Sequence, residues 1–115
     1  MSFRRASTGA TGTWFVGLMS GTSLDAVDAV LIDWAEHRHE VVAHHSEPIP
    51  DHLRAALVRL CQPGGLEGDP IDQVGIADRE MGELLADAVA TLLTTAGIPA
   101  GRIAAIGSHG QTIRH

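Results

Sequence analysis

A cluster of glycine and small hydroxyl side chains interrupts an apolar part of the chain near its start. Ser20, Gly21, Thr22 and Ser23 directly follow an apolar run at residues 14–19, and a second apolar run follows them. A turn built from Gly21, Thr22 and Ser23 presents several backbone N–H groups and two hydroxyls in one concavity, which attracts an anion such as a phosphate. An ordinary hairpin loop with solvated side chains is the alternative. The apolar flanks favour a loop at a sheet end that faces a cleft.

Two aspartates follow this cluster, at positions 25 and 28. Residues of opposite parity in a strand point to opposite faces, so Asp25 and Asp28 are not expected to form a side-by-side pair for a metal. Asp25, which is nearer the turn, is the better candidate for steering a magnesium-bound water beside phosphates. Capping of the turn backbone by Asp25 is the alternative.

A second polar cluster, GSHGQT, occupies residues 107–112. Glycines on both sides of Ser108 and His109 indicate a strand end that something approaches closely, where His109 and Gln111 would present hydrogen-bonding edges to a polar ligand. A tight turn in which the histidine has a hydrogen-bond partner is the alternative.

Five more histidines lack the spacing of a zinc site and have no cysteine partner, so we expect them at the surface. They are His37, His39, His44, His45 and His52.

Composition excludes several functions. The 115-residue chain has a net charge of −6, with 14 acidic residues against 8 arginines and no lysine. A nucleic-acid partner is not expected, because phosphate backbones need a basic face. Without lysine, a phosphate site must use backbone N–H groups, hydroxyls or arginine. No apolar run approaches the roughly 20 residues that span a bilayer, so no membrane partner is expected either. Cys61, the single cysteine, is expected in a helix core.

A sheet must position these candidate residues. The composition of residues 14–19, 26–34 and 40–49 predicts three consecutive antiparallel strands. Residues 103–107 predict a further strand, and Thr112 is expected to begin another.

Two helices are predicted between the third and fourth strands. Leu53, Leu57 and Leu60 recur at helical spacing after Asp51, which is placed to cap this first helix. A longer helical pattern covers residues 71–96.

No linker divides the chain. Residues 1–12 are expected to form a flexible leader and residues 13–115 one incomplete α/β unit. The chain is expected to be truncated, because it stops inside an apparent strand and its small sheet must cover two sizeable helices.

The segments GLMSGTSLDAVDAVLID and IAAIGSHGQTIRH, in this order and spacing, resemble the anhydro-N-acetylmuramic acid kinase family. The resemblance runs over residues 14–115. This family is a branch of the sugar-kinase, Hsp70 and actin superfamily, so the resemblance implies a ribonuclease-H-like α/β fold of the actin/hexokinase type. The chain would then be the N-terminal part of the first lobe.

The resemblance also implies an activity. Such kinases use ATP, with Mg²⁺, and water to open and phosphorylate 1,6-anhydro-N-acetylmuramic acid, giving N-acetylmuramic acid 6-phosphate in peptidoglycan recycling. It implies a bacterial cytoplasmic enzyme that forms a homodimer. The implied ATP-binding residues are Gly21, Thr22, Ser23, Leu24, Asp25, Ala26, Val27 and Asp28. Ser108, His109 and Gln111 would line the sugar side of the cleft. The general-base aspartate is expected beyond His115.

The sequence departs from the family pattern in two places. Ala26 stands where many relatives carry glycine, and Met19 or Ser20 stands where the superfamily has an aspartate. Two other interpretations stay open. One is a non-catalytic binding or dimerisation module in which the long helix docks a partner. The other is a serine hydrolase using Ser20 or Ser23 with His109 and Asp25, although the sequence lacks the usual G-x-S-x-G motif.

Overall fold

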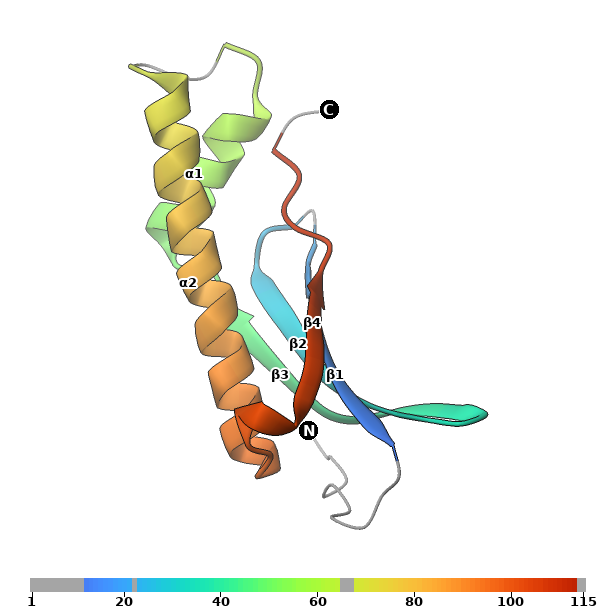
Figure 1. Ribbon diagram of the computed structural model, residues 1–115. Coiled ribbons are helices and arrows are strands. Elements are labelled where there is room, and N and C mark those ends of the chain that lie inside the picture. Colours follow the sequence, from blue (N-terminus) through green and yellow to red (C-terminus); the bar gives the residue numbers. More distant parts are fainter. Residues whose placement is uncertain (1–11, 22, 65–67, 114–115) are drawn as a thin grey trace.

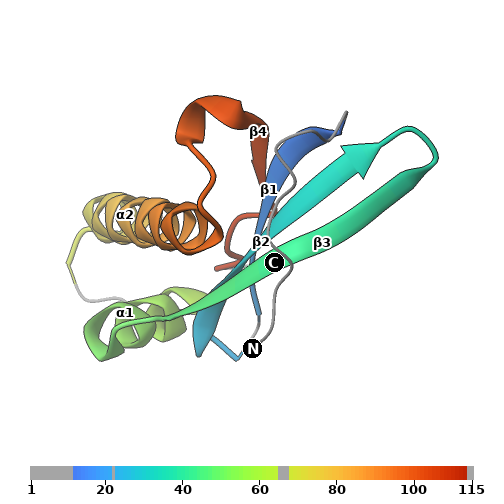
Figure 2. The ribbon, with the colours of Figure 1, turned by 90° about the horizontal axis from the view of Figure 1, so that it is seen from below.

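The computed structural model describes residues 12–21, 23–64 and 68–113, which form one mixed sheet with two helices (Figure 1). Both helices lie on the same side of the sheet (Figure 2). Apart from Gly12, the expected leader lies outside the described residues. The architecture confirms the expected incomplete α/β domain, with three antiparallel strands, two helices and a further strand.

The sheet has four strands in the order β3-β2-β1-β4. Strands β1 (Thr13–Ser20), β2 (Ala26–Ala35) and β3 (Arg38–Pro48) are antiparallel neighbours. Strand β4 (Ile103–Ser108) runs parallel to β1. The four strands predicted before residue 108 therefore exist, and their ends lie within two residues of the expected ones.

Alternation of apolar residues sets which sheet face meets the helices. One set of side chains from β1 and β2 is buried on that face, as the period of two in a strand requires. This set comprises Trp14, Val16, Leu18, Val27, Ala29 and Leu31. A register shift between Leu31 and Ile32 inserts one extra residue opposite them in β3. As a result, the consecutive residues Val42 and Ala43 are both buried.

The first helix, α1 (Asp51–Cys61), differs from its prediction in its capping residue and in the exposure of Cys61. Asp51 is the first helical residue, while the capping position is held by Pro50 and has no side-chain hydrogen bond. The prediction that Cys61 lies in the core is wrong: Cys61 is exposed, and its thiol donates to the Thr112 carbonyl at 3.7 Å. Leu60, one residue earlier, is the buried residue of this turn.

The second helix, α2 (Pro70–Ala96), has clear end signals. The Asp69 side chain accepts a hydrogen bond from the Ile71 N–H at 2.9 Å, and Pro70 opens the helix. Gly97 ends it at φ +74°, a left-handed conformation that glycine adopts without a steric penalty. No described helix combines the length and hydropathy needed to cross a bilayer.

The chain after β4 does not form the strand expected from Thr112, since residues 109–113 have no regular secondary structure. Gly110 turns the chain at φ +75°. The Thr112 carbonyl then accepts hydrogen bonds from the side chains of Gln111 and Cys61. These side-chain donors take the place of a strand partner.

Candidate functional site

The two polar clusters meet at one end of the sheet. Strands β1 and β4 are parallel neighbours, with Leu18 opposite Ser108 in the register. Both clusters follow the carboxyl ends of these strands. In open α/β sheets, ligands bind beside the carboxyl ends of parallel strands. The topology therefore brings together two segments that are about 85 residues apart in sequence.

A short hydrogen bond links the two clusters directly. The Ser20 hydroxyl, at the buried end of β1, lies 2.5 Å from Gln111 Oε1 and 3.4 Å from the Gly110 carbonyl. The Gln111 Nε2 donates to the Thr112 carbonyl at 3.0 Å. Both ends of the Gln111 amide thus have partners within the chain. In this arrangement Gln111 holds its own segment against the start of the loop after β1.

The loop between β1 and β2 is built around a buried leucine. The Leu24 N–H donates to the Gly21 carbonyl at 3.2 Å, which closes a tight turn. Leu24 has a left-handed backbone, φ +57°, and its side chain is only 5% exposed. Buried Leu24 leaves its neighbours Gly21, Ser23 and Asp25 at the surface. Thr22 lies outside the described residues.

An arginine from helix α1 reaches over this loop. Arg54 Nη2 lies 3.4 Å from Asp25 Oδ1 and 3.5 Å from the Ser23 carbonyl oxygen. The base of the loop is tied separately, because the Ile49 N–H donates to the Asp25 carbonyl at 3.0 Å.

The remaining residues of the expected ATP segment belong to strand β2. Val27 is fully buried in the core, so only its backbone could reach a ligand. Asp28 points to the opposite sheet face, where its carboxylate lies 3.0 Å from His44 Nε2. The expectation that Asp25 and Asp28 do not share a face agrees with these different partners, Arg54 and His44. Ala26 opens the strand and is partly buried.

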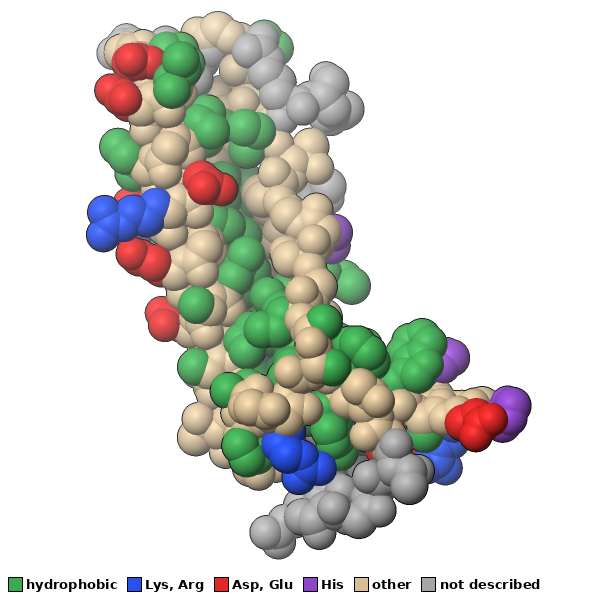
Figure 3. All heavy atoms as spheres, in the orientation of Figure 1, with side chains coloured by type: hydrophobic (Ala, Val, Ile, Leu, Met, Phe, Trp, Pro, Cys, Tyr) green, Lys and Arg blue, Asp and Glu red, His purple; other side chains and the backbone are tan. Residues whose placement is uncertain are grey.

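The second cluster is more open to solvent. Ser108 and His109 are exposed, and the Ser108 hydroxyl accepts a hydrogen bond from the Gly110 N–H at 3.1 Å. A cavity of about 190 Å³ lies against this segment and is lined by Gly110, Gln111 and Ile113 together with apolar residues of α1 and α2. Figure 3 shows hydrophobic side chains along the hollow between α2 and the β4 side of the molecule.

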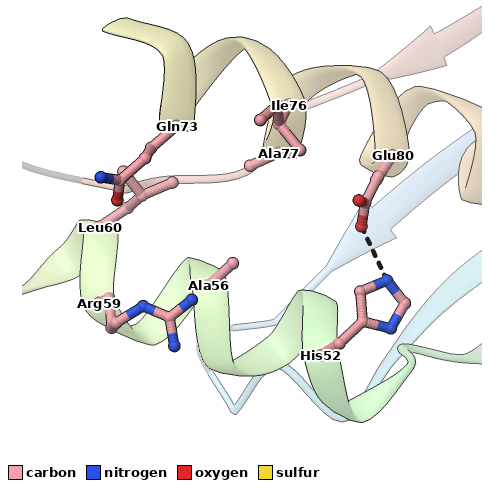
Figure 4. A pocket seen from close by; sticks show the side chains of 8 residues that line it. All are labelled: His52, Ala56, Arg59, Leu60, Gln73, Ile76, Ala77 and Glu80. Atoms are coloured by element: carbon pink, nitrogen blue, oxygen red, sulfur yellow. Dashed lines mark hydrogen bonds and ion pairs between the residues drawn. The ribbon is translucent and has the colours of Figure 1, made fainter. Parts of the chain in front are cut away.

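A larger cavity, about 710 Å³, is elsewhere (Figure 4). It is an open groove between α1 and α2, across which His52 Nε2 lies 2.9 Å from Glu80 Oε2. None of the described residues of either polar cluster lines it. The groove also includes Arg59, which is on α1 like Arg54.

The chemistry of the loop fits a magnesium-phosphate ligand. Among the described residues, no three His, Cys, Asp or Glu side chains converge as a metal site. Mg²⁺ commonly keeps several waters and takes one or two carboxylates together with substrate phosphates. The exposed Asp25 carboxylate is the group of this loop that would contribute to such a site, and Arg54 is the nearby cation in a lysine-free chain.

Sequence reasoning missed one residue and one contact of this region. Arg54 lies 29 positions after Asp25, and nothing local marks it as a loop contact. The sequence places Ser20 in the first polar cluster, but it does not predict the hydrogen bond from Ser20 to Gln111. The absence of lysine is the one sequence feature that directs attention to the few arginines.

Residues 13–115 match the family model described as anhydro-N-acetylmuramic acid kinase. Proteins of that name from Shewanella loihica and Shewanella denitrificans are 52% and 51% identical to the chain over 102 residues. A third, from Shewanella amazonensis, is 52% identical over 101 residues. These matches cover 88–89% of the chain but 27% of each relative, so the chain spans about a quarter of the length of these curated relatives.

Proposed function

The chain belongs to the anhydro-N-acetylmuramic acid kinase family, and from this premise we propose that it forms the phosphate-binding part of an ATP-dependent kinase. The proposed substrate of the whole enzyme is 1,6-anhydro-N-acetylmuramic acid. ATP and water would open the anhydro bridge and phosphorylate O6, giving N-acetylmuramic acid 6-phosphate and ADP. A cytoplasmic role in peptidoglycan recycling, and a homodimer, complete the proposal.

One observation supports this assignment most strongly: the hydrogen bond between Ser20 and Gln111. It places the loop of residues 21–25 next to the segment of residues 108–111. A nucleotide bound at the first and a sugar bound near Ser108 and His109 of the second would then be neighbours. Phosphoryl transfer depends mainly on such positioning and on neutralising charge.

The loop residues have distinct tasks in the proposal. Backbone N–H groups and hydroxyls of residues 21–23 bind phosphate oxygens, because the chain has no lysine for this purpose. Asp25 would hold a magnesium ion through bound water. When bound, Mg²⁺ neutralises developing charge on the phosphates. Leu24 anchors the loop in the core, and Ala26, Val27 and Asp28 continue it into β2.

The proposal assigns no general base to this chain. The base that activates water is expected beyond His115, so the 115 residues alone would bind nucleotide without turning it over. This separates the binding function of the loop from the activity of the whole enzyme.

Titration of the 115-residue chain with ADP and magnesium tests the loop assignment. We expect amide NMR shifts at residues 21–28 and none at the β2-β3 turn, Glu36 and His37, which serves as the internal control. Incubation with ATP and the anhydro-sugar should give no phosphorylated product. Absence of shifts at the loop would contradict nucleotide binding and favour a binding or dimerisation module. Product formation would contradict the placement of the base outside the chain.

A further inference from the structure

Arg54 projects from a fixed part of helix α1. Its backbone N–H donates to the Pro50 carbonyl at 2.9 Å, which is the first hydrogen bond of the helix. Leu53 and Leu57, on either side of it in sequence, are each 2% exposed and fix the helix to the core. The base of the Arg54 side chain therefore has little freedom relative to the sheet.

The guanidinium joins two parts of the loop through one nitrogen. Nη2 contacts the Ser23 carbonyl at 3.5 Å and the Asp25 carboxylate at 3.4 Å. The Ile49 N–H also donates to the Asp25 carbonyl. The loop is therefore held at its base by Ile49 and at its outer side by Arg54. With its carbonyl turned toward Arg54, Ser23 does not present that oxygen to an incoming anion.

Charge gives the contact a second effect. A carboxylate beside a phosphate site repels the ligand, and a cation next to that carboxylate reduces the repulsion. Arg54 is the cation in contact with Asp25 among the described residues. The Arg54 and Asp25 side chains are 50% and 68% exposed, so solvent weakens the pair without removing it.

We propose that Arg54 is a positioning residue of the phosphate loop, which it holds in a binding-competent shape through Ser23 and Asp25. This inference rests on the proposed function and adds a residue from outside the loop segment. Arg54 acts through Ser23 and Asp25, and its contact with the phosphates themselves is not part of the proposal.

The first test measures loop order without nucleotide. We expect Arg54→Ala to speed hydrogen exchange of the Leu24 amide, measured by NMR, because the outer tie of the loop is lost. Arg54→Lys should restore part of the protection, since an ammonium can still pair with Asp25. Arg59→Ala, on the same helix but in the groove of Figure 4, is the matched control and should leave exchange unchanged. Unchanged exchange in Arg54→Ala would overturn the proposal.

The second test measures ADP affinity by calorimetry in EDTA, so that Asp25 cannot act through a metal. Arg54→Ala should weaken binding about three- to fivefold, the scale of one partly exposed charged contact. In an Asp25→Asn background the same change should have a smaller effect, because the two residues act together. An undiminished effect would mean that Arg54 contacts phosphate directly, against the proposal. If the unmodified chain does not bind ADP, the proposed function fails, while the exchange measurement still decides the role of Arg54.

Discussion

At Leu24 the cost of a left-handed backbone opposes the gain from burying the side chain. Its left-handed backbone, φ +57°, costs an L-residue with a Cβ roughly 1–2 kcal/mol. Full burial of a leucine side chain contributes about 1.5–3 kcal/mol, and Leu24 is almost fully buried. Burial therefore outweighs strain. The loop keeps leucine where glycine would suit the backbone, because the side chain anchors the loop in the core.

This balance predicts an unusual order of stability for substitutions at Leu24. Leu24→Ala loses most of the buried side chain and keeps the strain, so unfolding free energy should fall by about 2–4 kcal/mol. Leu24→Gly loses the side chain but relieves the strain, and should be more stable than the alanine variant by roughly 0.5–1 kcal/mol. Urea unfolding measures both. Ser23→Ala, an exposed neighbour, should change stability little. An alanine variant as stable as the glycine variant would contradict the strain argument.

Residue types alone identified the loop but not its contacts. Ser20, Gly21 and Ser23 stood out because hydroxyls and glycine between apolar runs are a local pattern. The hydrogen bond from Ser20 to Gln111 and the reach of Arg54 across the loop both depend on chain folding over long distances. Hydropathy and spacing carry no information about such pairs.

At the scale of elements, local chemistry decided what could be predicted. Helix α2 has an aspartate cap, a proline at its start and a glycine at its end, and its predicted limits agree with the structure to one residue. The strands likewise follow from their composition. The prediction for Cys61 is wrong because helical periodicity identifies the apolar face of a helix but not how far the neighbouring layer extends. At the last turn of α1 Leu60 is still buried, whereas Cys61 already lies at the surface.

Two nearby positions on helix α2 are expected to contribute very differently to the unfolding free energy. Leu92 is 1% exposed and packs in the core between the helix and the sheet, whereas Thr94 on the same helix is exposed. Leu92→Ala should lower the unfolding free energy by about 2–5 kcal/mol, since it leaves a cavity. Thr94→Ala should change it by less than about 0.5 kcal/mol. Chemical denaturation followed by circular dichroism compares them. Equal losses would mean that α2 does not pack as described.

At the scale of the whole molecule, the helices cover only part of the sheet. The radius of gyration is 16.4 Å, against about 13 Å for a compact chain of this length. On the face without helices, Phe15, Ile32 and Val41 are neighbours in the strand register. Trp34 packs edge-on against Phe15 at 6.2 Å on this same face. Val41 and Trp34 are 59% and 52% exposed, so this face presents an apolar patch to solvent.

Such a patch predicts self-association of the 115-residue chain. Sedimentation velocity should show larger species as concentration rises, because association removes apolar surface from water. Val41→Lys should move the onset of association to higher concentration, since a lysine within the patch would lose hydration on contact. Thr91→Lys adds the same charge on exposed helix surface and should leave the onset nearly unchanged. Equal shifts in both variants would point to net charge rather than to the sheet face.

The position of β4 in the sheet has a separate consequence. Among the described strands β4 pairs only with β1, and β3 lies at the other end of the sheet. One copy could therefore hydrogen-bond through β4 to β3 of the next copy. A head-to-tail joint of this kind leaves a new acceptor strand at each step, so growth need not close into a dimer and can continue as a filament. Small residues such as Ala104, Ala105 and Gly107 place no charge along β4 to oppose it.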